Sequence, residues 1–154
     1  KRKTDTESIN QLKFHFSAFA NVQINNRGYL NIKNESGLLT SKNYLLNELY
    51  RIGGANSIRG YNEQSIFTNG YSYSNIEFRY SLDTSSYLYS ITDLGVYKEN
   101  TTNKIKKLLG IGAGYQFRIN NNLVNLGYVI STNSSTNAKL NSSRLVVRWT
   151  SFFY

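Results

Sequence analysis

The chain has 154 residues, a formal net charge of +9 and no cysteine, proline or methionine. Its length fits one domain or part of a larger one, and the lack of cysteine excludes disulfide bonds and thiolate metal sites. One histidine, His15, cannot build a multi-histidine metal site, and the scattered basic residues lack the dense run expected of a nucleic-acid groove.

Tyrosine is unusually frequent, with 13 tyrosines beside 8 phenylalanines in a chain of negative mean hydropathy. Tyrosine favours places where one end of its ring meets apolar groups and the other end meets water. No segment approaches the ~20 consecutive apolar residues of a membrane helix. Low hydropathy is nevertheless compatible with a membrane β-barrel, whose strands alternate between apolar outward and polar inward residues.

The first part of the chain predicts three strands. Residues 1–10 form a polar lead-in without the apolar segment of a signal peptide, which we interpret as following an internal cut. From residue 11 onward the hydrophobic period is two, and residues 11–24 predict a long half-buried strand with His15 on its polar face. A tight turn leads into a second strand, and a third is predicted at residues 45–54.

The segment GGANSIRGYNEQ, residues 53–64, carries an arginine that a simple turn does not need. Gly53, Gly54 and Gly60 permit sharp backbone turns on either side of Arg59. If a loop of about residues 53–70 folds back into a barrel lumen, Arg59 enters a low-dielectric space and needs a carboxylate partner.

Two candidate partners lie on the next two predicted strands, residues 70–82 and 86–99. Glu77 and Asp93 each fall near the middle of a polar face, and a short turn would bring these antiparallel neighbours together. Two carboxylates facing one guanidinium could hold it by charge-assisted hydrogen bonds and so pin the loop inside the barrel. The alternative is that Arg59 is solvated and that both acids line a wet pore.

The rest of the chain predicts three further strands at residues 107–119, 122–132 and 144–154. In the first of these, GIGAGY places glycines on the polar face, which we interpret as leaving room for the inserted loop. The prediction is therefore an all-β, antiparallel meander of about eight strands, each about ten residues long.

Two architectures fit this meander. A soluble β-sandwich would bury the apolar faces, whereas a membrane barrel would turn them towards lipid. Strand length favours the barrel, because a tilted membrane strand needs about 9–11 residues. Aromatic residues near strand ends and in the terminal WTSFFY suit the interfacial girdle of such a barrel.

The chain contains, in this order, RIGGANSIRGYNEQS, SNIEFRY, TDLG and GIGAGYQF, followed by a strand with a terminal aromatic residue. In their order and spacing, these segments resemble the C-terminal half of an Omp85-superfamily barrel. That superfamily includes BamA/TamA-type insertases and two-partner-secretion transporters. The resemblance covers residues from about 45 to 154. It implies a transmembrane β-barrel of sixteen strands, of which this chain supplies the last eight.

By the same resemblance, Arg59, Gly60 and Tyr61 correspond to the arginine–glycine–aromatic triplet of a loop that re-enters the barrel. Glu77 and Asp93 correspond to the inward acids that hold this arginine.

The end of the chain corresponds to the terminal strand that carries the insertion signal. The residues assigned to this signal are Trp149, Phe152, Phe153 and Tyr154. Here the chain departs from the family pattern, because the clean apolar phase contains Trp149 and Phe153, whereas the phase of Tyr154 also contains Arg144 and Arg148.

The resemblance implies insertion, assembly or translocation of proteins in a Gram-negative outer membrane. Expected partners are membrane lipid and lipopolysaccharide, outer-membrane or secreted client proteins, the N-terminal barrel half with its POTRA repeats, and accessory lipoproteins. No cofactor, metal, nucleic acid or catalytic activity is expected. The alternative is a complete eight-stranded outer-membrane barrel with a structural or adhesive role.

Overall fold

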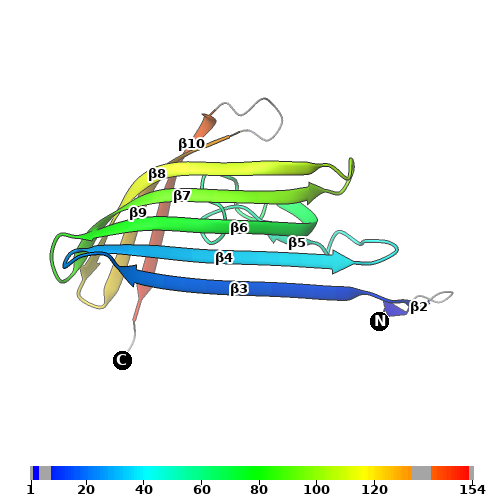
Figure 1. The fold of residues 1–154 in the computed structure, drawn as a ribbon, viewed down its shortest axis with the longest axis horizontal. Helices are drawn as coiled ribbons and strands as arrows, with labels where there is room; N and C mark the ends of the chain where they lie inside the picture. Colours follow the sequence, from blue (N-terminus) through cyan, green and yellow to red (C-terminus); the bar gives the residue numbers. More distant parts are fainter. Residues whose placement is uncertain (1, 4–7, 133–139, 153–154) are drawn as a thin grey trace.

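A computed structural model gives the fold of residues 2–3, 8–132 and 140–152 (Figure 1). Within these ranges there is no helix, and hence none long and apolar enough to cross a membrane. The strands are β1 (Arg2–Lys3), β2 (Ser8–Ile9), β3 (Leu12–Gln23), β4 (Gly28–Thr40), β5 (Tyr50–Ile52), β6 (Ile66–Ser81), β7 (Ser86–Glu99), β8 (Ile105–Ile119), β9 (Asn122–Thr132) and β10 (Leu140–Ser151).

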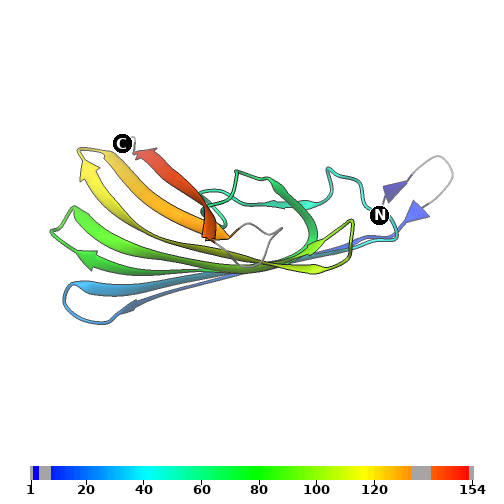
Figure 2. The same ribbon diagram turned by 90° about the horizontal axis from the view of Figure 1, so that it is seen from above.

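Eight of these strands form one sheet in the order β10-β9-β8-β7-β6-β4-β3, with β5 beside β6. All pairings are antiparallel, and β1 and β2 form a separate two-stranded sheet within the lead-in region. The large sheet is open between its edge strands β3 and β10, and Figure 2 shows it curling so that β8–β10 rise on one side. The predicted all-β antiparallel fold is confirmed, and the open curled sheet is consistent with part of a larger barrel.

The third predicted strand is much shorter than expected. β4 pairs directly with β6 as far as Leu38 opposite Gly70, so most of that edge of β6 is already occupied. Only Tyr50–Ile52 adds to the same edge, opposite residues 66–68. Residues 41–65 are therefore one long excursion between β4 and β6. The inward-folding loop ends before β6 begins at Ile66, several residues earlier than predicted.

The two faces of the sheet have opposite characters. The convex face carries apolar side chains that remain exposed, and the concave face carries the polar and tyrosine side chains that become buried. Exposed apolar residues include Phe78, Leu88, Leu94, Ile111, Leu145 and Val147; buried inward residues include Asn31, Tyr73, Tyr89, Asp93 and Tyr97. A soluble sandwich would bury the first set, whereas a barrel in lipid exposes it.

Candidate functional site

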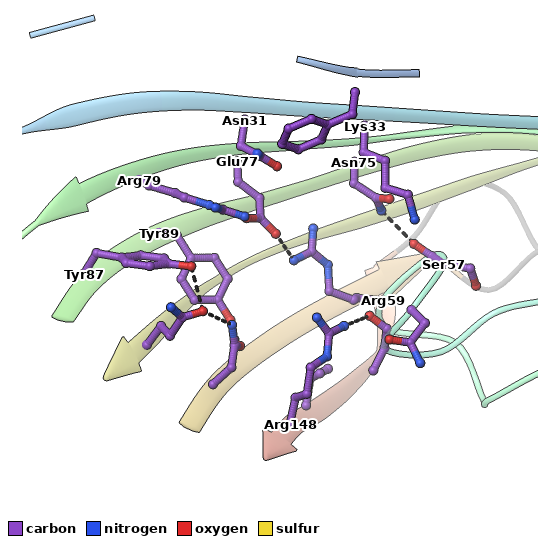
Figure 3. Close-up of a pocket in the computed structure, with 16 residues that line it drawn as sticks. Asn31, Lys33, Ser57, Arg59, Asn75, Glu77, Arg79, Tyr87, Tyr89 and Arg148 are labelled. Atoms are coloured by element: carbon purple, nitrogen blue, oxygen red, sulfur yellow. Dashed lines mark hydrogen bonds and ion pairs between the residues drawn. The ribbon is translucent and has the colours of Figure 1, made fainter. Parts of the chain in front are cut away.

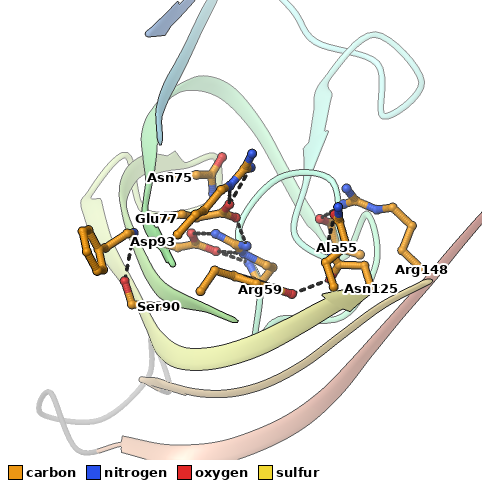
Figure 4. Close-up of polar contacts among 12 residues, drawn as sticks. Ala55, Arg59, Asn75, Glu77, Ser90, Asp93, Asn125 and Arg148 are labelled. Atoms are coloured by element: carbon orange, nitrogen blue, oxygen red, sulfur yellow. Dashed lines mark hydrogen bonds and ion pairs between the residues drawn. The ribbon is translucent and has the colours of Figure 1, made fainter. Parts of the chain in front are cut away.

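The part of the excursion that follows β5 folds back over the concave face of the sheet (Figure 4). Its backbone turns sharply at three glycines with positive φ, Gly53 (+107°), Gly54 (+98°) and Gly60 (+93°). Hydrogen bonds within the segment close it into a compact turn, from Gly54 N to the Ile58 carbonyl (3.0 Å) and from Gly53 N to Ser57 Oγ (2.6 Å). We call residues 53–65 the inserted loop.

Arg59 on the inserted loop is held by carboxylates from two neighbouring strands. Its Nε and one terminal nitrogen donate to the two oxygens of Asp93 on β7, at 2.8 and 2.6 Å, and its backbone N–H donates to the same carboxylate at 2.8 Å. The other terminal nitrogen donates to Glu77 on β6. Asp93 is fully buried and Arg59 is 7% exposed. The structure therefore brings together the three residues that the sequence singled out as a loop anchor.

Glu77 accepts hydrogen bonds from two arginines. One of its oxygens accepts from Arg59, and the other accepts from Nε and a terminal nitrogen of Arg79 at 2.9 and 2.7 Å. Asp93 lies opposite Asn75, two residues from Glu77 along β6, so one guanidinium can reach both acids diagonally. The positive charges of two arginines balance the negative charges of two carboxylates, which lowers the free-energy cost of burying them.

Two strands at the far end of the sheet hold the backbone of the inserted loop. The Gly60 carbonyl accepts from Ser131 Oγ on β9 at 2.7 Å and from Arg144 Nε on β10 at 2.9 Å. Arg148 on β10 donates to the Ala55 carbonyl at 2.6 Å (Figure 4). The inserted loop thus joins β6 and β7, through Arg59, to β9 and β10.

Sequence reasoning missed Arg144 and Arg148 as site residues, although it noted them as the charges that disturb the phase of the last strand. Their spacing of four places both on one face of a strand, and the structure turns that face inward. The apolar phase that contains Leu145, Val147 and Trp149 faces outward and is exposed. The apparent irregularity of the terminal strand is therefore part of the loop site.

Tyr61, the aromatic residue of the predicted triplet, also contacts the wall. Its hydroxyl lies 3.0 Å from Thr132 Oγ1 on β9 and accepts from the Leu109 backbone N–H at 3.2 Å. Elsewhere on the loop, the Ser57 carbonyl accepts from Asn75 on β6 at 2.7 Å. Polar contacts with the wall therefore extend over the middle of the inserted loop, from residue 55 to residue 61.

Apolar packing, and glycines that leave space because they have no side chain, also hold the inserted loop against the sheet. Ile58 is fully buried in a cluster with Ile52, Tyr73, Tyr97 and Leu108. A side-chain carbon added at Gly95 on β7 would lie 2.5 Å from Ile58 Cδ1, and one added at Gly110 on β8 would lie 2.5 Å from the Arg59 carbonyl oxygen.

The predicted role of the glycines in GIGAGY holds for one of them. Gly110 makes room for the inserted loop, whereas Gly114 faces the ring of Tyr89 and Gly112 faces the backbone of β9. The sequence pattern identified the glycine face but not which neighbour occupies each position, because that depends on where other strands and the loop lie.

Between the inserted loop and the wall lies a polar cavity of about 320 Å³ (Figure 3). Arg59, Glu77 and Arg79 line it on one side, and Arg148 lines it on another. Within the described ranges no group of three or more histidine, aspartate or glutamate side chains is placed to hold a metal ion. The cavity is suited to water and polar chain segments.

The remaining predicted residues lie away from this site. Trp149 is exposed on the outward face of β10, where its ring N–H contacts Asn122 and Ser151 at 3.2 and 3.0 Å. Phe152 follows the strand, near the guanidinium of Arg118. Two further residues of the predicted insertion signal, Phe153 and Tyr154, lie outside the described residues.

His15 also lies apart, on the edge strand β3, where its Nε2 is 4.0 Å from Glu35. It contacts none of the groups that hold Arg59.

The contacts of Arg144 lead to a direct prediction. Arg144→Ala removes a charged donor from the Gly60 carbonyl, and such hydrogen bonds contribute roughly 1.5–3 kcal/mol. We expect faster hydrogen exchange at residues 53–65 while the Arg59 ion pairs persist, as measured by mass spectrometry on the folded protein. Arg118→Ala, which removes an exposed arginine that does not touch the loop, is the matched control. Unchanged hydrogen exchange of the inserted loop in Arg144→Ala would show that the contact between Arg144 and the Gly60 carbonyl does not help to hold the loop.

The chain is similar to a known protein family. The family model described as haemolysin secretion/activation protein ShlB/FhaC/HecB matches residues 1–117, which is well over half of the chain. No curated protein matches the sequence. The matched region contains the inserted loop and both strands that hold Arg59.

Proposed function

The chain belongs to the ShlB/FhaC/HecB family of haemolysin secretion/activation proteins, and from this premise we propose that its barrel passes a specific client protein across the outer membrane without covalent chemistry. The family is part of the Omp85 superfamily of outer-membrane β-barrel transporters. The protein is therefore an outer-membrane β-barrel of the protein-secretion class.

The anchored inserted loop is the observation that supports a role in transport. A solvated arginine would need no buried acids, yet Asp93 is fully buried and both of its oxygens accept from Arg59. Desolvated charges are retained at a cost that neutral side chains would avoid. We propose that the anchor holds the loop and the four wall strands that it joins in the arrangement needed for transport.

The polar character of the concave face supports the same proposal. A translocating chain exposes backbone N–H and C=O groups, which need hydrogen-bonding partners when they leave bulk water. The cavity beside Arg59 offers such groups from Asn75, Gln116 and Asn125. No bond is made or broken in this step, so we propose that the protein is not an enzyme.

Insertion of other outer-membrane proteins is the second candidate. β10 is an edge strand in the described sheet, with β9 as its single neighbour, and an unpaired edge can accept an incoming strand. In either case we propose that the full protein also contains the N-terminal barrel half and POTRA repeats, and that accessory lipoproteins assist it.

Proteomics of cells with and without the full-length protein separates the two candidates. Quantitative mass spectrometry would compare the growth medium, periplasm and outer membrane. For secretion we expect one or a few proteins to disappear from the medium of cells that lack the protein, while other outer-membrane barrels keep their abundance. Loss of many outer-membrane barrels with an unchanged medium would overturn the secretion proposal in favour of insertion.

A further inference from the structure

The connections at the two ends of the sheet differ in length. Residues 24–27, 82–85 and 120–121 form short turns at one end, whereas the other end carries the excursion of residues 41–65 and the shorter connection of residues 100–104 (Figure 1). Outer-membrane barrels place short turns in the periplasm and longer loops outside the cell. The end of β7 at Glu99 and the start of β8 at Ile105 therefore lie on the external side.

Two lysines sit on the outward face at this external end. On β7 the outward positions run from Leu88 to Val96, and the next outward residue towards the external end is Lys98. On β8, which runs the opposite way, they run from Ile119 back to Leu109, and the next outward residue is Lys107. Both stretches, the one on β7 with Ser90 and Thr92 between its apolar residues, match the about 9–11 residues that a tilted strand needs to cross a bilayer. Both lysines therefore lie at the level of the external lipid headgroups.

The register places the two lysines diagonally on adjacent strands. Lys98 lies opposite Ile105, and Lys107 lies opposite Val96. Neither lysine forms an ion pair with a carboxylate among the described residues, whereas the inward Lys106 lies 3.9 Å from Glu99. The outward pair is thus a local concentration of positive charge that no acidic side chain neutralises.

An apolar groove of about 440 Å³ opens on the same outward face beside Lys98. Leu38, Val96 and Ile105 line it, and Gly70 on β6 leaves it open because it has no side chain. A carbon added at Gly70 would lie 3.5 Å from Leu38 Cδ1 and 4.0 Å from Lys98 Cβ, which are ordinary contacts. The groove can therefore be filled by substitution without straining the backbone.

We propose that Lys98 and Lys107 bind the phosphate groups of lipopolysaccharide and that the groove at Gly70 receives one of its acyl chains. The external leaflet of a Gram-negative outer membrane is built from this phosphorylated glycolipid. A lysine at the edge of the apolar band can extend its ammonium group to the headgroup level and bind phosphate by charge-assisted hydrogen bonds. The lysines that would contact the headgroup and the apolar groove that would receive the acyl chain lie side by side on this face.

The test uses the full-length protein in detergent and measures retention of bisphosphorylated lipid A by native mass spectrometry. The variants are Lys98→Gln with Lys107→Gln, and Gly70→Leu, with Lys106→Gln as the matched inward control. We expect affinity to fall about fivefold for each outward lysine removed, to fall also in Gly70→Leu, and to stay unchanged in Lys106→Gln. Heat-modifiable migration on a gel checks that each variant is folded.

Three outcomes would overturn this site. They are wild-type retention by the double lysine variant, equal retention of dephosphorylated lipid A, and equal retention of phosphatidylglycerol, which would point to a general anionic-lipid surface. The assay contains no transport step, so its failure leaves the secretion proposal untouched.

Discussion

Arg59→Ala is expected to detach the inserted loop from the wall and to abolish most client secretion while leaving the strands intact. The substitution leaves Asp93 fully buried without its guanidinium partner. Breaking a buried pair in this way costs about 3–5 kcal/mol, enough to shift the balance between anchored and free loop by more than about a hundredfold. The strands keep their own hydrogen bonds, so far-ultraviolet circular dichroism should not change.

Two further variants separate the lost anchor from the unpaired charge. Arg59→Ala combined with Asp93→Asn removes the uncompensated carboxylate, while Glu77 keeps Arg79 as its partner, so we expect it to recover thermal stability but not secretion. Arg59→Lys keeps the charge but loses the bidentate geometry, and we expect intermediate secretion. Wild-type secretion by Arg59→Ala, in the presence of wild-type amounts of protein in the membrane, would refute a transport role for the anchor.

Gly60→Ala should disturb the same site from the backbone. Gly60 has φ of +93°, a conformation that alanine adopts only at a cost of about 1–3 kcal/mol. Its new side-chain carbon would lie 2.6 Å from Ser131 Cβ and 3.3 Å from Val129 Cγ1. We expect the loop to shift away from β9, with faster exchange of residues 53–65 and reduced secretion.

Thr92→Ala is the control for this change, because Thr92 lies in the same sheet on β7 but on the outward face, away from the inserted loop. It should secrete as the wild type does. If Gly60→Ala also shows wild-type secretion and wild-type loop exchange, then close packing between the loop and β9 is unnecessary.

The strands and their faces were predictable because they depend on local information. A period of two places alternate side chains on opposite faces wherever the strand lies, so Glu77 and Asp93 could be assigned to polar faces from the sequence alone. A hairpin between neighbouring strands brings those faces together, which made both acids reasonable partners for Arg59.

The third strand was mispredicted because its pairing is not local. The sequence around residues 45–54 has strand-like residues, yet β4 already occupies most of the edge of β6 that it would need. Competition for a strand edge depends on register between segments far apart in the chain, which a hydrophobic period does not report.

The sequence by itself predicted an antiparallel all-β meander in which Glu77 and Asp93 lie on the polar faces of the two strands after a glycine-flanked arginine, and it left open whether that arginine is anchored or solvated. Only the tertiary structure decided that Arg144 and Arg148 hold the backbone of the same loop. Backbone carbonyls accept hydrogen bonds from any donor that reaches them, so such contacts leave no residue signature in the loop. They arise from the curvature of the sheet, which brings β10 across to a segment more than eighty residues earlier in the chain.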